Sequence, residues 1–225
     1  MLLVPMMSKN PAAAGGGGSA VSVNNTMSGG NGASGKSQQV STNTTIQSTG
    51  LTINSGTNSM LVTLLVWSSG TAPTGVTAEW DSAGTPQALT QAGTVQFDTN
   101  SSVAIFYLLN PTVGNKTLTA NWTNAQDCVM SAICFDNAGG IAAGDTQQNS
   151  TNTVTVTSGA NDATVAVYNC DGGTPTGSQT NIFDNSALGP SSSGDYALGG
   201  SSNAHTFTIG SSTFRVTIGI HVTAA

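Results

Sequence analysis

The sequence predicts an all-β protein, an antiparallel β-sandwich of jelly-roll type, and three observations lead to this prediction. No window of a dozen residues shows the apolar periodicity of a helix. Short apolar or alternating runs instead recur between turn-forming residues, roughly a dozen of them from Thr42 onward. The most continuous apolar run, Met60–Trp67, is bounded by Gly56–Ser59 and Ser68–Gly70. A strand that is apolar on both faces belongs in the middle of a sheet with material packed on each side.

The other expected strands follow in order along the chain. Val103–Leu109, stopped by Asn110-Pro111, and Cys128–Phe135 are nearly continuous apolar runs like the central one. The shorter runs are Thr44–Ser48, Leu51–Asn54, Gly75–Trp80, Gln87–Gln91, Thr94–Asp98, Lys116–Trp122, Thr153–Thr157, Ala163–Tyr168, Asn181–Asn185, Tyr196–Leu198 and Thr206–Ile209.

The closing run, Phe214–Val222, has the cleanest alternation, with a period of two residues, which is typical of a strand with one buried face. The inward set is Phe214, Val216, Ile218, Ile220 and Val222, and the outward set is Arg215, Thr217, Gly219, His221 and Thr223.

Charged residues make up only 6% of the 225 residues, with four basic against ten acidic side chains and a net charge of −6. Binding to DNA or RNA requires Lys and Arg to neutralise phosphates, so nucleic acid is not an expected partner. No apolar run approaches the roughly 20 residues that span a bilayer, so no membrane partner is expected either. The surface must therefore consist mostly of Ser, Thr, Asn, Gln and Gly.

Residues 1–40 differ in composition from residues 41–225, and we expect an extended low-complexity arm followed by the sandwich domain. Ala12–Gly18 and Ser28–Gly35 are rich in small flexible residues. Ordering a backbone costs about 1 kcal/mol or more per residue, so we expect neighbouring subunits to hold this arm. The apolar residues expected to make these contacts are Leu2, Leu3, Val4, Met6, Met7, Val21, Val23 and Met27.

The first residues do not read as a signal peptide. The apolar run that starts at Met1 is broken by Pro5, no basic residue precedes it, and Lys9 follows it. We therefore expect synthesis without a signal peptide.

Cys128, Cys134 and Cys170 are expected to be buried thiols that behave as small apolar side chains. Cys128 and Cys134 are six residues apart on one strand and hence about 20 Å apart. This distance is far beyond the reach of a disulfide, although a bridge from Cys170 to one of them stays open.

The segment Gly30–Ser37 matches the phosphate-binding loop pattern G-x-x-x-x-G-K-[ST]. Phosphate binding by such a loop needs a buried strand before it and a helix after it. The polar residues on either side provide neither, so we expect no nucleotide and no other cofactor.

No catalytic or metal-binding residue is predicted. The two histidines, His205 and His221, have no G-x-S-x-G motif to accompany them, although a Ser-His-Asp site built from distant loops stays open. The histidines and thiols show no zinc-ligand spacing. Glu79 and Asp81 flank Trp80 on one strand, where we expect a solvated acidic face, whereas glycosidase carboxylates face each other across a cleft. Calcium binding lacks a supporting loop motif.

Tyr196 lies in a segment rich in Ser and Gly and is the candidate for an exposed aromatic ring that contacts a glycan. The other Trp and Tyr residues mostly lie in strands on the apolar phase, which is typical of core residues.

Residues 41–225 resemble a jelly-roll-like β-sandwich family of tailed-phage structural proteins and bacterial surface proteins. The resemblance rests on turn and packing motifs and brings no catalytic residues with it. These motifs are Asn58–Val62, Gly75–Thr77, Pro86–Thr90, Ile105–Pro111, Lys116–Ala120, Val154–Gly159, Asp162–Val165, Gly177–Thr180 and the closing strand.

The resemblance implies a non-enzymatic structural protein on the surface of a virion, either a capsid decoration (cement) subunit or a fibre-type subunit. Residues 1–40 would attach it to other virion or capsid subunits, and we expect a cyclic homo-oligomer, a trimer. The alternative function is a carbohydrate-binding or adhesion module on a cell or particle surface, with a glycan as partner.

Overall fold

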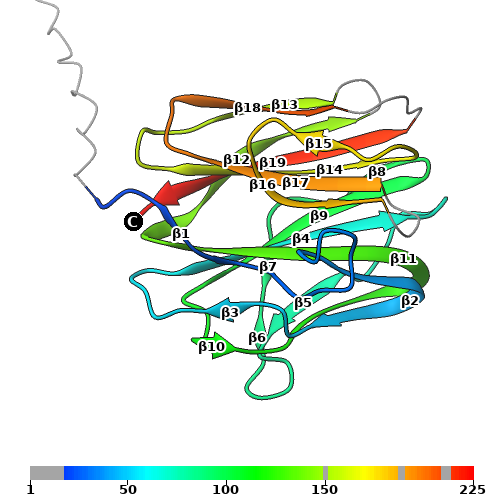
Figure 1. Ribbon diagram of the computed structural model, residues 1–225, viewed down its shortest axis with the longest axis horizontal. Helices are drawn as coiled ribbons and strands as arrows, with labels where there is room; N and C mark the ends of the chain where they lie inside the picture. The colour runs from blue at the N-terminus through cyan, green and yellow to red at the C-terminus, as the bar shows by residue number, and fades with distance from the viewer. Residues whose placement is uncertain (1–17, 149–151, 187–190, 209–213) are drawn as a thin grey trace, which may run out of the picture.

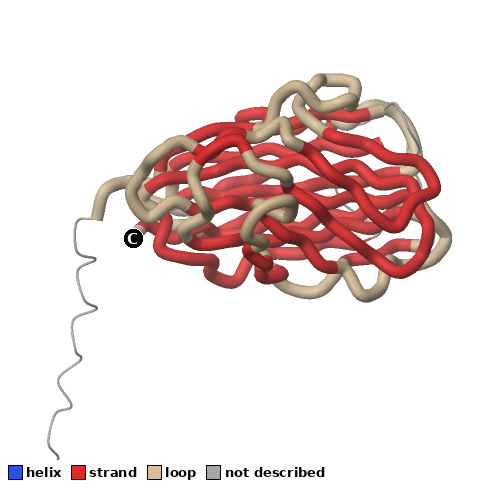
Figure 2. The backbone as a smooth tube through the Cα atoms, turned by 90° about the horizontal axis from the view of Figure 1, so that it is seen from below, coloured by secondary structure: helices blue, strands red, loops and turns tan. Residues whose placement is uncertain are grey.

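The computed structural model describes residues 18–148, 152–186, 191–208 and 214–225, which form nineteen β-strands (Figures 1 and 2). All recorded strand pairs are antiparallel, as in β4 with β9 and β14 with β19. The predicted fold class, an all-β antiparallel sandwich, is confirmed, whereas the jelly-roll connectivity stays a prediction. The described residues contain no helix that is long and apolar enough to cross a membrane.

The central run forms β4 (Met60–Ser68), which lies between β9 (Ser101–Leu109) and β11 (Leu118–Asp136) in a nine-stranded sheet. Every residue from Met60 to Trp67 is buried, so the prediction of a central strand covered on both faces is confirmed. The other strands of this sheet are β1 (Ser22–Thr26), β2 (Gln38–Ser48), β5 (Thr77–Trp80), β6 (Gln87–Ala88), β7 (Thr90–Gln91) and β8 (Gln96–Asp98).

Strand β11 merges two predicted strands into one of 19 residues and allows the sheet to curl back on itself. Its first residues pair with β5 and its last residues with β4, while β2 runs along its other edge. Even-numbered side chains from Leu118 to Cys134 line one core inside the curl, whereas Val129, Ile133 and Phe135 face a second core. The alternation along a single strand therefore supplies both cores.

A five-stranded sheet packs on the outer face of this curled sheet, and the second core lies between the two. Figure 1 shows the two sheets stacked, with β14 and β19 above β9 and β4. The strands of this sheet, in spatial order, are β12 (Ala138–Gln148), β19 (Arg215–Ala224), β14 (Ala163–Cys170), β17 (Ser191–Leu198) and β16 (Thr180–Asn185).

A third layer covers the far face of the five-stranded sheet (Figure 1). It consists of β13 (Thr153–Thr157), β18 (Ser202–Thr208) and β15 (Thr176–Gly177), and a separate short pair, β3 (Thr52–Ile53) with β10 (Gly114–Asn115), lies at the opposite end. The inward set of the closing strand does face the core, as Val216 and Ile218 show. Its outward set was expected to face solvent, and this prediction is wrong, because the third layer buries Thr217.

The third layer approaches the five-stranded sheet most closely at Gly219. A Cβ atom at this position would lie 2.5 Å from Cγ2 of Val156 on β13. Real Cβ atoms essentially never come so near, so only glycine permits this packing.

Residues 21–40 belong to the folded body instead of forming an arm. Strand β1 pairs with the last residues of β11, and Met27 donates its backbone N–H to Ala132 at 2.9 Å. The predicted boundary at residue 40 falls inside β2 and is wrong. The physical reason is that ladder hydrogen bonds with β11, together with burial of Val21 and Met27, offset the entropy cost of ordering this polar stretch.

The described chain begins beside its own C-terminus (Figures 1 and 2). Asn137 joins the two ends: its backbone oxygen accepts from Ala225 at 2.9 Å, and its side chain donates to the Ala20 oxygen at 3.1 Å. The described part of the chain therefore begins at the same corner as its last residue, Ala225.

Replacing Gly219 with Ala is expected to destabilise the fold by about 1–3 kcal/mol, because the added methyl group overpacks the interface with Val156. Urea unfolding monitored by tryptophan fluorescence measures the change. Gly140→Ala on β12 is the matched control, since a Cβ there would have its nearest neighbour at 3.9 Å. Equal stability of the two variants would contradict the close approach of the third layer.

Candidate functional site

Most of the described carboxylates accept hydrogen bonds from backbone or side-chain groups of their own chain. Asp136, for example, accepts hydrogen bonds from Asn24 at 3.0 Å and from Ser59 at 2.6 Å. Asp127 accepts from the hydroxyl of Ser41 and the backbone N–H of Thr42, both at 2.8 Å. The described residues contain no group of three or more metal-ligating side chains. These carboxylates therefore have a structural role, because they link segments of the chain by hydrogen bonds.

Glu79 and Asp81 differ in burial, although strand alternation predicts that both side chains lie on the same face. Asp81 is buried and forms an ion pair with Lys116, with an Oδ2–Nζ distance of 3.3 Å. Glu79 is half-buried on β5. The expectation of a solvated acidic strand face is thus wrong for Asp81, because Lys116 compensates for the burial of its charge.

A hydrogen-bonded cluster of polar side chains is buried between the third layer and the five-stranded sheet. His205 on β18 places its Nδ1 atom 2.5 Å from Oδ1 of Asp195 on β17 and its Nε2 atom 2.9 Å from Oγ1 of Thr164 on β14. The second carboxylate oxygen of Asp195 accepts the backbone N–H of Gln179 at 3.0 Å. Three strands and one loop thus meet at one histidine.

The order hydroxyl, imidazole and carboxylate is the order of a nucleophile, a general base and an orienting acid. Thr164, His205 and Asp195 are all fully buried, however, with exposed fractions of 0%. A substrate carbonyl has no access to the Thr164 hydroxyl in this arrangement. The cluster therefore fastens the third layer to the sheet beneath it, and sequence reasoning missed it because its members lie on separate strands.

The second histidine forms a partly exposed pair at the edge of the same sheet. Nε2 of His221 lies 2.7 Å from Oδ2 of Asp162, which also accepts the Gly159 N–H at 2.7 Å. The other carboxylate oxygen accepts the Ala224 N–H at 2.8 Å. Burial by itself raises the pKa of Asp162, but these hydrogen bonds from Ala224, His221 and Gly159 outweigh it and hold the pKa below its usual value.

All three thiols are buried, as the sequence predicts, and none forms a disulfide within the described part of the chain. Burial, together with the nearby Asp136 carboxylate, raises the pKa of Cys134 to about 12 and outweighs a hydrogen bond from the Met60 backbone. Burial likewise raises the pKa of Cys128 well above its usual value. Neither thiol is a reactive thiolate at neutral pH.

The glycine-rich motif forms a compact turn that uses its own backbone donors. The N–H groups of Gly30 and Gly32 donate to the carbonyl oxygens of Gly35 and Ser37 at 3.0 and 2.8 Å. The Ala33 N–H donates a hydrogen bond to Oδ1 of Asn185 at 3.3 Å. A strand, β2, follows the motif instead of a helix. These N–H groups are thus used within the chain, and the absence of a nucleotide stays a prediction.

The residues expected to contact a partner divide into two groups. Val21 and Met27 are buried, and Val23 is half-buried against the core between the two large sheets. For Val21 and Met27 the expectation is wrong, because their side chains are used inside their own chain. The remaining residues lie outside the described part of the chain, and their role stays a prediction: Leu2, Leu3, Val4, Met6 and Met7.

Tyr196 is half-buried on β17 and packs against the core. Its ring meets that of Phe135 edge to face, with a centroid distance of 6.0 Å. The expectation of an exposed aromatic platform is therefore wrong at this position, and a glycan contact of Tyr196 stays a prediction without a free ring to support it.

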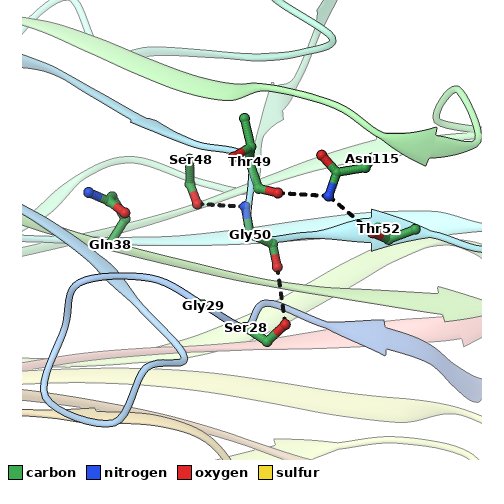
Figure 3. Close-up of a pocket in the computed structure, with 8 residues that line it drawn as sticks. All are labelled: Ser28, Gly29, Gln38, Ser48, Thr49, Gly50, Thr52 and Asn115. Atoms are coloured by element: carbon green, nitrogen blue, oxygen red, sulfur yellow. Dashed lines mark hydrogen bonds between the residues drawn. The ribbon is translucent and has the colours of Figure 1, made fainter.

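The candidate binding surface is a hollow of about 310 Å³ beside the start and end of β2 (Figure 3). Its floor is fixed by short contacts: the Ser48 hydroxyl accepts the Gly50 N–H at 3.0 Å, and the Asn115 amide donates to the Thr49 oxygen at 2.9 Å. A Cβ at Gly50 would lie 2.2 Å from the Ser28 oxygen, so glycine is required there.

A second hollow of about 270 Å³ shares Gln38, Ser48 and Thr49 with the first, so the two form one continuous surface, which we name the polar groove. Sequence reasoning missed it, because Ser, Thr and Gln are common throughout the chain. The lining consists of Ser28, Gly29, Gln38, Gln47, Ser48, Thr49, Gly50, Thr52, Asn115 and Thr117, without a charged or aromatic side chain.

Replacing His205 with Ala is expected to cost about 3–5 kcal/mol of unfolding free energy, because the fully buried Asp195 would lose the partner of its Oδ1 atom. Denaturant unfolding measures the loss. Asp195→Leu combined with His205→Phe removes both partners, and this double variant should be more stable than His205→Ala. A loss below about 1 kcal/mol for His205→Ala would contradict the fastening role.

Asp162 should contribute stability that depends on pH. Its pKa in the fold lies below the unfolded value of about 3.9, so its contribution is fully present above that pH and is lost as the pH falls through the folded pKa. The stability difference between the wild type and Asp162→Asn should therefore shrink between about pH 5 and pH 2, as measured by thermal unfolding. A stability difference that stays constant over this pH range for Asp162→Asn would contradict the assignment.

Comparison with known proteins adds little to this geometry. No protein-family model matches the chain, and no curated protein matches it. Among solved structures, the chain is similar to the N-terminal CBM22-1-CBM22-2 tandem domain from Paenibacillus barcinonensis Xyn10C, with 11% sequence identity and a TM-score of 0.33. The similarity covers 93% of this chain and 92% of that one. At this level it carries no argument about function.

Proposed function

We propose that the chain is a non-enzymatic structural protein on the surface of a virion, a decoration or fibre-type subunit that attaches to neighbouring subunits through residues 1–17. The supporting observation is where the apolar side chains lie. Among the described residues, the only exposed large hydrophobic side chains are Leu109, Val113 and Leu198. The folded body thus offers little apolar surface for a stable contact.

Outside the described residues, the strongest apolar sequence is Leu2–Met7, with five apolar residues around Pro5. In the sequence, Gly15–Gly18 link this stretch to the described body, whose first residues lie beside the C-terminus (Figure 1). An apolar stretch on a glycine-rich connection suits insertion between neighbouring subunits, while the body faces outward.

The folded body has the properties expected of a structural subunit that stays folded without a cofactor. Its carboxylates serve as fasteners, its thiols are buried, and its only triad-like cluster is sealed from solvent in the described structure. We propose a cyclic homo-oligomer, a trimer, as the assembled form.

The alternative, a carbohydrate-binding or adhesion module, is favoured by one observation, the polar groove. The groove is lined by described residues of the folded body. The two functions are therefore compatible within one chain.

Deleting residues 1–17 is expected to abolish attachment to the particle while the body still folds. The measurement is co-sedimentation of the purified chain with virions that lack it, with circular dichroism and the Tm as readouts of folding. The full chain should sediment with the particles, and a variant starting at Gly18 should stay in the supernatant.

A matched control replaces Leu2 and Leu3 with Ser and keeps the length of the segment. This variant should lose attachment as the deletion does, because apolar contact is the proposed cause. Attachment that survives the deletion would overturn the anchoring role, and failure of the full chain to bind any particle would overturn the virion assignment.

A further inference from the structure

We propose that the polar groove is a binding site for a neutral glycan. The inference rests on the alternative function given above and specifies the ligand class of this groove, which is lined by described residues of the folded body. The groove is separate from the buried His205 cluster, and four of its side chains carry the inference: Gln38, Gln47, Thr49 and Thr117.

These four side chains have unused hydrogen-bonding groups. The amides of Gln38 and Gln47 and the hydroxyls of Thr49 and Thr117 make no hydrogen bond to another described residue, whereas Asn31 and Asn115 in the same region bond within the chain. Each Gln amide offers two donors and an acceptor, and each hydroxyl offers one donor and two acceptor sites. Adjacent hydroxyls of a sugar present the same mixture of donors and acceptors.

The floor of the groove is rigid, so these groups project from a fixed base. Asn115 donates to the Thr49 oxygen at 2.9 Å and to the Thr52 hydroxyl at 3.1 Å (Figure 3). The Ser28 N–H donates to the Gly50 oxygen at 2.8 Å. A preformed surface loses less conformational freedom when a ligand binds.

Size and charge narrow the class of ligand. The two joined hollows, of about 310 and 270 Å³, have the volume needed for a short run of sugar units. The lining is uncharged on a chain with a net charge of −6, so acidic sugars such as sialic acid are disfavoured. Because no aromatic ring lines the groove, stacking is absent and each site should bind weakly, with a Kd of about 1 mM.

The test is titration of the ¹⁵N-labelled full chain with neutral oligosaccharides, namely gluco-, xylo- and N-acetylglucosamine oligomers, observed by two-dimensional NMR. The expected result is that at least one series shifts the side-chain amide signals of Gln38 and Gln47 in a saturable manner. A sialylated oligosaccharide should bind more weakly than its neutral counterpart.

Gln38→Ala and Gln47→Ala should each weaken binding about tenfold, as expected for the loss of one or two hydrogen bonds. Gln91→Ala is the matched control, because this half-buried side chain on β7 lies outside the groove, and it should leave the Kd unchanged. A variant lacking residues 1–17 should bind as the full chain does, which separates this result from the particle-attachment experiment.

Three outcomes would overturn the proposal. One is the absence of any saturable shift with every oligosaccharide, and another is a set of shifts that lies outside the groove. The third is an extended Thr/Ser-rich peptide that shifts Gln38 and Gln47 when no sugar does, which would identify the groove as a peptide site instead.

Discussion

The fold depends on one constraint: β4 is buried along its whole apolar run, so both faces of its sheet must be covered. The curl of the nine-stranded sheet covers one face and the five-stranded sheet covers the other. The long strand β11 makes this possible, because its even-numbered and odd-numbered side chains serve different cores. Covering one sheet on two sides with strands alone forces the chain into stacked layers.

The outer face of the five-stranded sheet must be covered as well, and this face is more polar than the faces that line the main core. The face of β14 and β19 away from the main core carries Thr164, Tyr168 and Thr217, which cannot be buried without partners or close packing. Gly219 lets β13 approach closely, and His205 joins β18 to two strands below it. At this interface a glycine and a histidine therefore add to a small apolar cluster of Val154, Ala166, Tyr168, Cys170 and Phe207.

The strands that sequence reasoning predicted are those with a strong apolar signal, such as β4, β9 and β13. It missed the first half of β2, and β12 and the Ser191–Gly194 part of β17, where polar, Gly or Ser residues carry no periodicity and only pairing with a distant strand makes them extended. The same limit applies to the sites. The buried cluster of Thr164, Asp195 and His205 depends on strand pairing that no local pattern encodes, and the polar groove is built from residue types that occur everywhere in the chain.

The low charge of the chain links its fold to how it can recognise a partner. With four basic and ten acidic side chains, and with Lys116, His205 and His221 each paired to a carboxylate, the described surface has few charges to steer a partner from a distance. Recognition must then rely on short-range forces, which are apolar contact and neutral hydrogen bonds. The sequence offers the first at Leu2–Met7, and the groove offers the second at Gln38 and Gln47. Both forces are weak per site and gain strength when many copies act together.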